Sequence, residues 1–231
     1  MEWRSSWAGR RGWLLVSRQP VIPNVEGTCA IQAVADALQA RFKIADMRDG
    51  KIVSYALPYC DQFASEMLER RILGTYGADI SDVLDEVMYV GIPVDRVDLR
   101  FPNIHQGMDQ HRKIAGYRIM PVNGEHEVAE RLLCDEIKMN GPVIGELVLA
   151  RDFLSSNGHT YGPSINNPKM MVTRGDGTIV CHAVAITGYG WRPSGQRFLE
   201  FQNNWGIEPH IGGIGTMLFS ALRRVFIPIV D

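Results

Sequence analysis

The chain has 231 residues, of which 45% are hydrophobic and 22% are charged, and its formal net charge at pH 7 is -2. These fractions are those of a globular protein and exclude a largely disordered chain. The near-neutral charge argues against an electrostatic binder of nucleic acid, and no apolar run of about 18 residues predicts a membrane-spanning helix. Four cysteines are too few for a disulfide-rich scaffold.

Helices dominate the predicted structure of the first half of the chain. An uninterrupted Ala-rich apolar run predicts a buried helix over residues 29–42, with Thr28 as its N-cap. A second helix is predicted over residues 81–90, where its first residue, a serine, would cap the start and Gly91 would end it. A third helix is predicted over residues 126–139.

Strands dominate the second half, where the hydrophobic period shortens towards two. Residues 143–149, 180–189 and 197–202 are predicted to form strands. Because helices and strands are separated along the chain, the pattern favours the α+β class over an alternating parallel sheet.

Cys29 is the first candidate for chemistry. A thiol in the first turn of a helix feels the positive end of the helix dipole, which lowers its pKa and favours the thiolate. A nucleophilic thiolate also needs a proton partner, usually histidine, and a third group that orients the histidine. His182 lies on a predicted strand and Asn203 directly follows another, so the chain offers both.

Several motifs, in this order and at this spacing, resemble the papain-like cysteine peptidases. They are Glu2-Trp3-Arg4, Gly27-Thr-Cys29 with the Ala-rich helix after it, Asp79-Ile-Ser-Asp-Val-Leu, Tyr89-Val-Gly-Ile92, Ile114-Ala-Gly-Tyr-Arg118, Asn140-Gly-Pro-Val143, His182-Ala-Val with Gly188-Tyr-Gly190, and Asn203-Asn-Trp-Gly206. The resemblance extends along most of the chain.

The resemblance implies a papain-like two-lobed α+β fold with a substrate cleft between the lobes. The helical lobe would cover residues 5–115, and an antiparallel, barrel-like β-lobe would cover residues 116–231. Whether the terminal segments are exchanged between the lobes stays open.

The resemblance also implies roles for individual residues. Cys29 would be the nucleophile and His182 its acid–base partner. Asn203 would orient the imidazole ring, and Trp205 would shield that contact from water. The backbone N–H of Cys29 would supply one half of an oxyanion hole.

The sequence departs from the family pattern around the nucleophile. The glutamine that usually completes the oxyanion hole falls on Pro23, which has no N–H to donate. Asn24 or Gln19 would replace it only if the loop is shifted. Ala30 stands where the family has tryptophan. Losing one oxyanion donor typically costs about 10²–10³ in rate, so we expect weakened activity.

Four residues are candidates for the pocket that receives the residue before the one cleaved. By ungapped comparison with the family they are Asp79, Ile80, Glu146 and Val180. Two acids there would favour a basic side chain. The alternative is that one or both carboxylates point to solvent.

The cysteines and the chain start bear on the compartment. Cys60 resembles a family half-cystine without a partner, Cys134 is expected on the core side of the third helix, and Cys181 precedes His182, so no disulfide is predicted. We find no secretory signal and no inhibitory pro-segment before the mature start. A cytoplasmic or other non-secretory location is therefore expected.

The sequence fits three functions to different degrees. The leading one is thiol-dependent hydrolysis of peptide bonds through an acyl-enzyme, by a monomer that takes a peptide or protein substrate and uses no cofactor, metal, nucleic acid or membrane. The alternative is a non-catalytic relative that binds a peptide or protein in the old cleft. A metal site of Cys181, His182 and His210 is disfavoured because no cluster has zinc-ligand spacing.

Overall fold

A computed structural model describes residues 3–6, 27–50, 54–58, 60–98, 110–122, 126–153, 160–162, 171–204 and 213–231. The helices in these ranges are α1 (Cys29–Arg48), α2 (Cys60–Glu69), α3 (Ile80–Tyr89), α4 (His126–Asn140) and the short 3-10 helix η3 (Phe219–Ala221). The strands are β1 (Trp3–Ser6), β2 (Ser54–Pro58), β3 (Ile92–Asp98), β4 (Gln110–Arg112), β5 (Gly116–Pro121), β6 (Val143–Val148), β7 (Cys181–Trp191), β8 (Arg197–Gln202), β9 (Ile214–Met217) and β10 (Leu222–Ile229).

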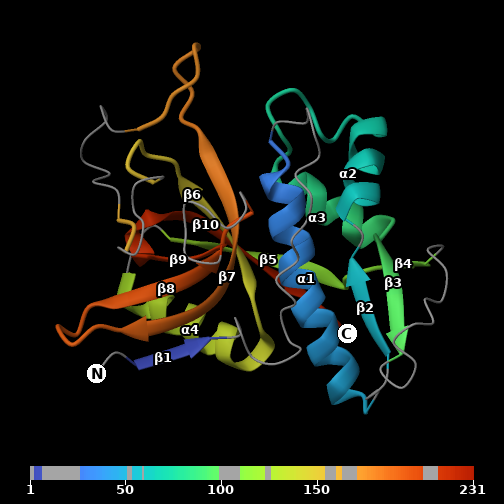
Figure 1. The fold of residues 1–231 in the computed structure, drawn as a ribbon, viewed down its shortest axis with the longest axis horizontal. Coiled ribbons are helices and arrows are strands. Elements are labelled where there is room, and N and C mark those ends of the chain that lie inside the picture. The colour runs from blue at the N-terminus through green and yellow to red at the C-terminus, as the bar shows by residue number, and fades with distance from the viewer. Residues whose placement is uncertain are drawn as a thin grey trace.

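These elements form two lobes side by side (Figure 1). One lobe holds α1, α2, α3 and a three-stranded sheet in the order β2-β3-β4. The other holds α4 and a seven-stranded sheet in the order β5-β10-β6-β7-β8-β9, with β1 paired to β7. The described strand pairs in both sheets are antiparallel, which confirms the α+β class.

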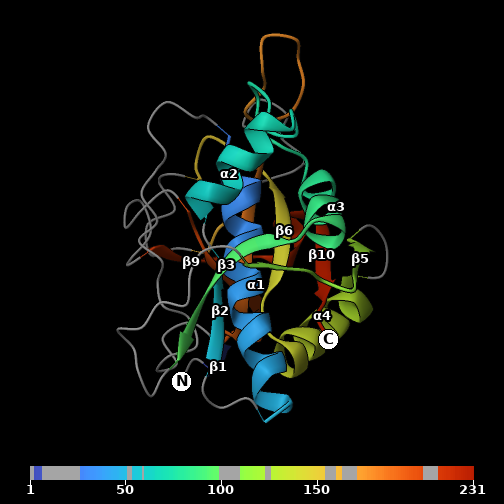
Figure 2. The same cartoon turned by 90° about the vertical axis from the view of Figure 1, so that its right-hand side faces the viewer.

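The large sheet separates two hydrophobic cores because its side chains alternate between its faces. Ile144, Ala183, Ala185 and Phe226 face the core built around α1. Their strand neighbours pack with α4 in the second core; these are Val143, Val184, Ile186 and Val225. Figure 2 shows α1 lying in front of β6, so helix α1 and the sheet meet directly.

Helix α1 is longer than predicted and is buried on every side. It continues to Arg48, beyond the expected end at residue 42, because neither glycine nor proline interrupts it before Gly50, which has a φ of 73°. Polar residues such as Gln39 and Lys43 are buried in its second half. Thr28 is the N-cap residue as predicted, but its side chain makes no capping hydrogen bond.

The second predicted helix is confirmed as α3, with a corrected cap. Asp79, and not Ser81, is the N-cap residue, and its carboxylate accepts the backbone N–H of Ser81 at 2.8 Å. Gly91 ends the helix as predicted: its φ is 104° and its N–H donates to the carbonyl of Glu86.

The later predicted elements are confirmed within two residues. The third helix is α4, and the three strands are β6, β7 and β8. Helix α2 was missed although its buried residues, Cys60, Phe63, Ala64 and Met67, follow the i, i+3, i+4, i+7 spacing of an amphipathic helix. None of the helices in the described ranges combines the length and apolar character that a membrane crossing requires.

Candidate active site

Cys29 is the first residue of α1 and lies where the two lobes meet. The approach to it is shaped by Gly27, which packs against Gly77 so closely that a Cβ on Gly27 would lie 2.5 Å from the Cα of Gly77. Both glycines have positive φ angles, 84° and 98°, which other residues adopt at a cost. The turn around Gly77 is thereby held beside the start of α1.

The surroundings of Cys29 act on its thiol in opposite directions. Burial raises the pKa of the thiol above its ordinary value, and the backbone N–H groups of Ala183 and Ala30 act to lower it. Burial outweighs these donors, so the expectation that the helix terminus would lower the pKa was wrong in its net direction. Because the N–H of Ala183 acts on it, the thiol lies next to β7. Ala183 is the residue directly after His182.

His182 is 2% exposed and pairs with Asn203 across the β7–β8 region. The distance between His182 Nε2 and Asn203 Oδ1 is 2.9 Å. The ring also packs edge-on against Phe153, with 5.5 Å between the ring centroids. Two packed contacts therefore hold the imidazole of His182 in one orientation.

The hydrogen bonds of Asn203 fix which nitrogen of the imidazole carries the proton. Asn203 Oδ1 also accepts the backbone N–H of Asn204 at 3.0 Å, and a backbone N–H can only donate. The atom facing His182 is therefore an oxygen, and Nε2 must be the donor. In the neutral ring this leaves Nδ1 as the nitrogen with the lone pair.

Asn204 is a site residue that the sequence reasoning did not identify. Its Nδ2 donates to the carbonyl oxygens of Cys29 at 3.0 Å and of Ala183 at 3.2 Å. It stands where the resembling family has a serine, and nothing in the sequence pattern marks it as a hydrogen-bond donor between the lobes.

The two acids of the predicted pocket meet at one arginine. Arg224 binds Glu146 through Nε at 2.6 Å and Nη2 at 2.9 Å, and Nη2 also reaches Asp79 at 3.2 Å. Burial acts to raise the pKa of Asp79, but the backbone N–H of Ser81 and then the hydrogen bond and charge of Arg224 hold it below its ordinary value. Glu146 is 8% exposed, whereas the side chain of Asp79 is 44% exposed. Both carboxylates are balanced by the charge of Arg224, which weakens the case for a basic side chain in this pocket.

The other two pocket candidates, Ile80 and Val180, are apolar. Ile80 is buried in the core around α1. Val180 is partly buried just before β7, where its backbone bonds to Leu149 and Val172. Trp205 and Asn24 lie outside the described residues, as do Pro23, Gln19 and His210.

The four cysteines, all described, form no disulfide bond. Cys60 and Cys134 are buried, as predicted for Cys134, and burial raises the pKa of Cys134 to about 12. Cys181 is partly exposed, and its sulfur accepts a hydrogen bond from Arg223 Nη1 at 3.4 Å. Within the described ranges, no three metal-ligating side chains gather as a metal site would require.

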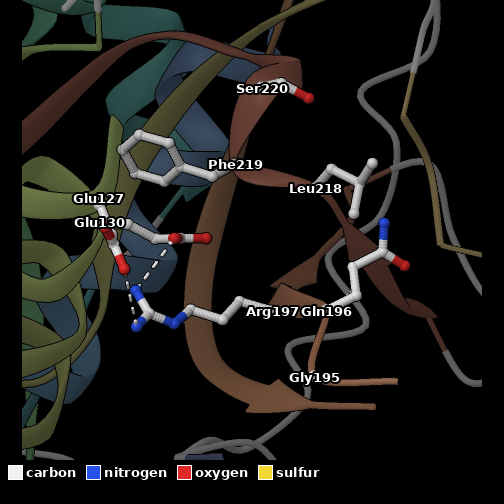
Figure 3. A pocket seen from close by; sticks show the side chains of 8 residues that line it. All are labelled: Glu127, Glu130, Gly195, Gln196, Arg197, Leu218, Phe219 and Ser220. Atoms are coloured by element: carbon white, nitrogen blue, oxygen red, sulfur yellow. Dashed lines mark hydrogen bonds and ion pairs between the residues drawn. The ribbon is translucent and has the colours of Figure 1, made fainter. Parts of the chain in front are cut away.

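A cavity of about 410 Å³ lies on the β-lobe, among residues of α4, the β7–β8 turn and η3 (Figure 3). Its charged groups bind one another: Arg197 Nη1 lies 3.2 Å from Glu130 and its Nη2 lies 4.0 Å from Glu127. It contains none of the predicted site residues and is separate from the Cys29 region.

Comparison with known proteins identifies the fold. No family model and no curated protein matches the chain. Among solved structures, the proform of the ragweed pollen cysteine protease Amb a 11 matches with a TM-score of 0.58 and 19% identity over 88% of this chain and 59% of that one. Procathepsin B S9 from Trypanosoma congolense matches with a TM-score of 0.59 and 12% identity, over 88% of this chain and 69% of that one.

The digestive procathepsin L2 proteinase from the larval midgut of Tenebrio molitor matches with a TM-score of 0.61 and 19% identity, over 88% of this chain and 61% of that one. The chain thus spans less than two thirds of the ragweed and Tenebrio chains. At such low sequence identities the structural similarity establishes the fold alone. The chain has the two-lobed papain-like fold of these cysteine proteases, in a divergent sequence.

Proposed function

We propose that this protein hydrolyses peptide bonds, with Cys29 as the nucleophile, His182 as its acid–base partner and Asn203 as the residue that orients the imidazole. The observation that carries the proposal is the 2.9 Å contact between His182 Nε2 and Asn203 Oδ1. It places the lone pair on Nδ1 of a histidine whose neighbour, Ala183, lies against the Cys29 thiol. Acyl transfer by a thiol requires a base held in one tautomer, with a lone pair that can take the proton of the thiol.

In the proposed reaction the proton of the Cys29 thiol passes to His182 Nδ1 as the sulfur attacks the peptide carbonyl carbon. The C–N bond then breaks, and the imidazolium returns its proton to the leaving amine. Water, deprotonated by the same nitrogen, releases the acid from the thioester. The N–H of Cys29 at the start of α1 would stabilise the oxyanion, because the first N–H groups of a helix have no partner within it.

Because the pKa of Cys29 is raised, His182 has to accept the thiol proton during the reaction. Since burial favours the neutral thiol, the nucleophile must be generated during attack by transfer of its proton to His182. This requirement, together with the missing oxyanion glutamine, supports a slow or narrow peptidase over a broad digestive one.

A peptidyl vinyl sulfone tests the proposal. It should modify Cys29 in the folded protein, and Cys29→Ala should abolish the labelling. Cys181→Ser is the matched control, because Cys181 is the other partly exposed thiol and its loss should leave labelling intact. A folded protein that stays unlabelled at high reagent concentration would refute the peptidase assignment.

A second candidate is a non-catalytic protein that binds a peptide in the cleft. The feature that favours it is the burial of Cys29, which raises the pKa of the thiol and favours its neutral form, since a binding cleft needs no thiolate. It predicts that a partner captured by the wild-type protein is bound equally well by Cys29→Ala. Loss of the biological effect in this variant, with the fold intact, would refute it.

A further inference from the structure

Three consecutive residues, the last of β8 and the two after it, form hydrogen bonds to α1 and β7, the elements that hold Cys29 and His182. Gln202 donates from Nε2 to Asp36 of α1 at 3.2 Å, and Asn203 binds His182. Asn204 makes a third connection, from one amide nitrogen to two backbone carbonyls. This third connection is the one whose two acceptors lie in different lobes.

The orientation of the Asn204 amide is settled by its partners. Both partners are carbonyl oxygens, which only accept hydrogen bonds, so the atom between them is the NH₂ group. Each of its two hydrogens has an acceptor. The backbone N–H of Asn204 is held as well, by Asn203 Oδ1, so the side chain starts from a fixed position.

The two carbonyls belong to residues on opposite sides of the proposed reaction. One is that of Cys29 itself, in the first turn of α1, and the other is that of Ala183, directly after His182 on β7. Bonds of 3.0 and 3.2 Å from a single nitrogen limit how far these two backbones can separate. The distance between the thiol and the imidazole is therefore coupled to the Asn204 amide.

We propose that Asn204 is a positioning residue, whose side-chain amide sets the separation of the Cys29 thiol and the His182 imidazole across the lobe interface. The inference rests on the proposed thiol–imidazole chemistry and deepens it. Asn203 orients the ring within the β-lobe, whereas Asn204 holds the nucleophile's backbone against the strand of the base. Removing the NH₂ group lets α1 and β7 move apart and misaligns the pair.

Two reagents separate positioning from simple stability. Iodoacetamide reacts with any accessible thiolate, by displacement of iodide. A peptidyl vinyl sulfone is different: the sulfur bonds to the β-carbon, the π electrons move to the α-carbon, and that carbon takes the proton held by the imidazolium. The second reaction depends more strongly on the distance between Cys29 and His182, because it also consumes the proton of the imidazolium. Peptide mass spectrometry gives both rate constants at Cys29 specifically.

The variants are Asn204→Ala, Asn204→Leu, which keeps the branched shape without donors, and Asn204→Ser, which keeps one donor. Asn140→Ala is the matched control, because Asn140 Nδ2 also makes a 3.0 Å hydrogen bond, to Glu136, away from the site. Thermal unfolding selects the temperature at which every variant is folded.

For Asn204→Ala and Asn204→Leu we expect the iodoacetamide rate to rise at least about fivefold, because a lost buried hydrogen bond favours opening of the interface. The ratio of vinyl sulfone to iodoacetamide rates should fall at least about tenfold, since small misplacements of reacting groups are costly. Asn204→Ser should be intermediate and Asn140→Ala unchanged. A wild-type ratio in folded Asn204→Leu would overturn the proposal.

Failure of the peptidase assignment is distinguishable from failure of this one. If the wild-type protein reacts with iodoacetamide but not with the vinyl sulfone, the peptidase assignment fails. The iodoacetamide rate alone then tests the role of Asn204. A higher rate in Asn204→Leu supports its holding of α1 against β7, and an unchanged rate overturns it.

Discussion

Asp36 and Gln202 meet inside the protein: the carboxylate of Asp36, in the middle of α1, accepts a hydrogen bond from Gln202 Nε2 at 3.2 Å. Asp36 is 6% exposed, and burial raises its pKa to about 7. A neutral amide is a weak partner for a buried charge, so the protonated carboxyl is favoured here over a wide pH range.

The pH dependence of stability should report on Asp36. The unfolded chain releases this proton near the ordinary pKa of about 3.9, whereas the folded chain keeps it until about pH 7. Between these values the folded state binds more protons, so its stability falls as pH rises and levels off above pH 7. The fall attributable to Asp36 is on the order of 4 kcal/mol, at about 1.4 kcal/mol per pKa unit.

Chemical denaturation of wild-type protein and Asp36→Asn, at several values between pH 4 and 8, isolates this contribution. The difference between the two free energies of unfolding should move in favour of the asparagine variant as the pH rises. Asp61→Asn, on the exposed side of α2, is the control and should show no such trend. A wild-type-minus-variant difference that stays constant with pH would contradict the prediction.

Arg41 should be a major contributor to the contact between α1 and the β-lobe. It is 5% exposed, and its guanidinium donates to the carbonyls of Pro142 and Pro228 and binds Glu136 at 3.0 Å. Replacing it with methionine leaves buried acceptors without donors, which costs about 3–5 kcal/mol.

The matched control for Arg41→Met is Arg118→Met. Arg118 binds the same carboxylate, Glu136, at 3.0 Å, but its side chain is 63% exposed. An exposed pair contributes about 0–1 kcal/mol, so this variant should be nearly as stable as the wild-type protein in urea. Equal losses in the two variants would show that burial of the guanidinium is not what matters.

The elements with a strong local pattern were predictable from the sequence. The Ala-rich run from Cys29, the break at Gly91 and the alternating strands all follow from periodicity and backbone chemistry. The burial of the polar residues in the second half of α1 was not predictable, because side chains such as those of Gln39, Arg41 and Lys43 are usually exposed. Their burial depends on partners far away in the chain, such as Pro228 for Arg41.

The same distinction applies to the candidate site. Cys29, His182 and Asn203 could be named as candidates because each lies in a recognisable motif. Asn204 and Arg224 were missed, because their importance comes from what they touch. Asn204 contacts Cys29 across 175 residues, and Arg224 contacts Asp79 across 145. Such distant pairings leave no local periodicity to detect.

Asp79 makes two interactions, a helix cap and an ion pair, and two variants separate their contributions to stability. Its carboxylate caps α3 through the N–H of Ser81 and also binds Arg224. Asp79→Ala removes both interactions and should cost about 1 kcal/mol, most of it from the cap. Asp79→Asn keeps a capping oxygen and loses only the exposed ion pair, so thermal unfolding should place it close to the wild-type protein. Equal destabilisation by the two variants would assign the effect to Arg224 instead.

The thiol of Cys29 should become reactive only at high pH when no substrate is present. Burial raises its pKa above the ordinary value of 9.0, so the thiolate fraction keeps growing through pH 9. The iodoacetamide rate at Cys29, followed by peptide mass spectrometry from pH 5 to 10, should therefore rise without a plateau below pH 9.

Cys134 serves as the internal standard in the same digest. It is 8% exposed and its pKa is raised to about 12, so it should stay unmodified across the range. A rate at Cys29 that is already constant between pH 6 and 8 would contradict the prediction. It would mean that a protonated His182 stabilises the thiolate more than burial destabilises it, and His182→Ala should then restore the rise with pH.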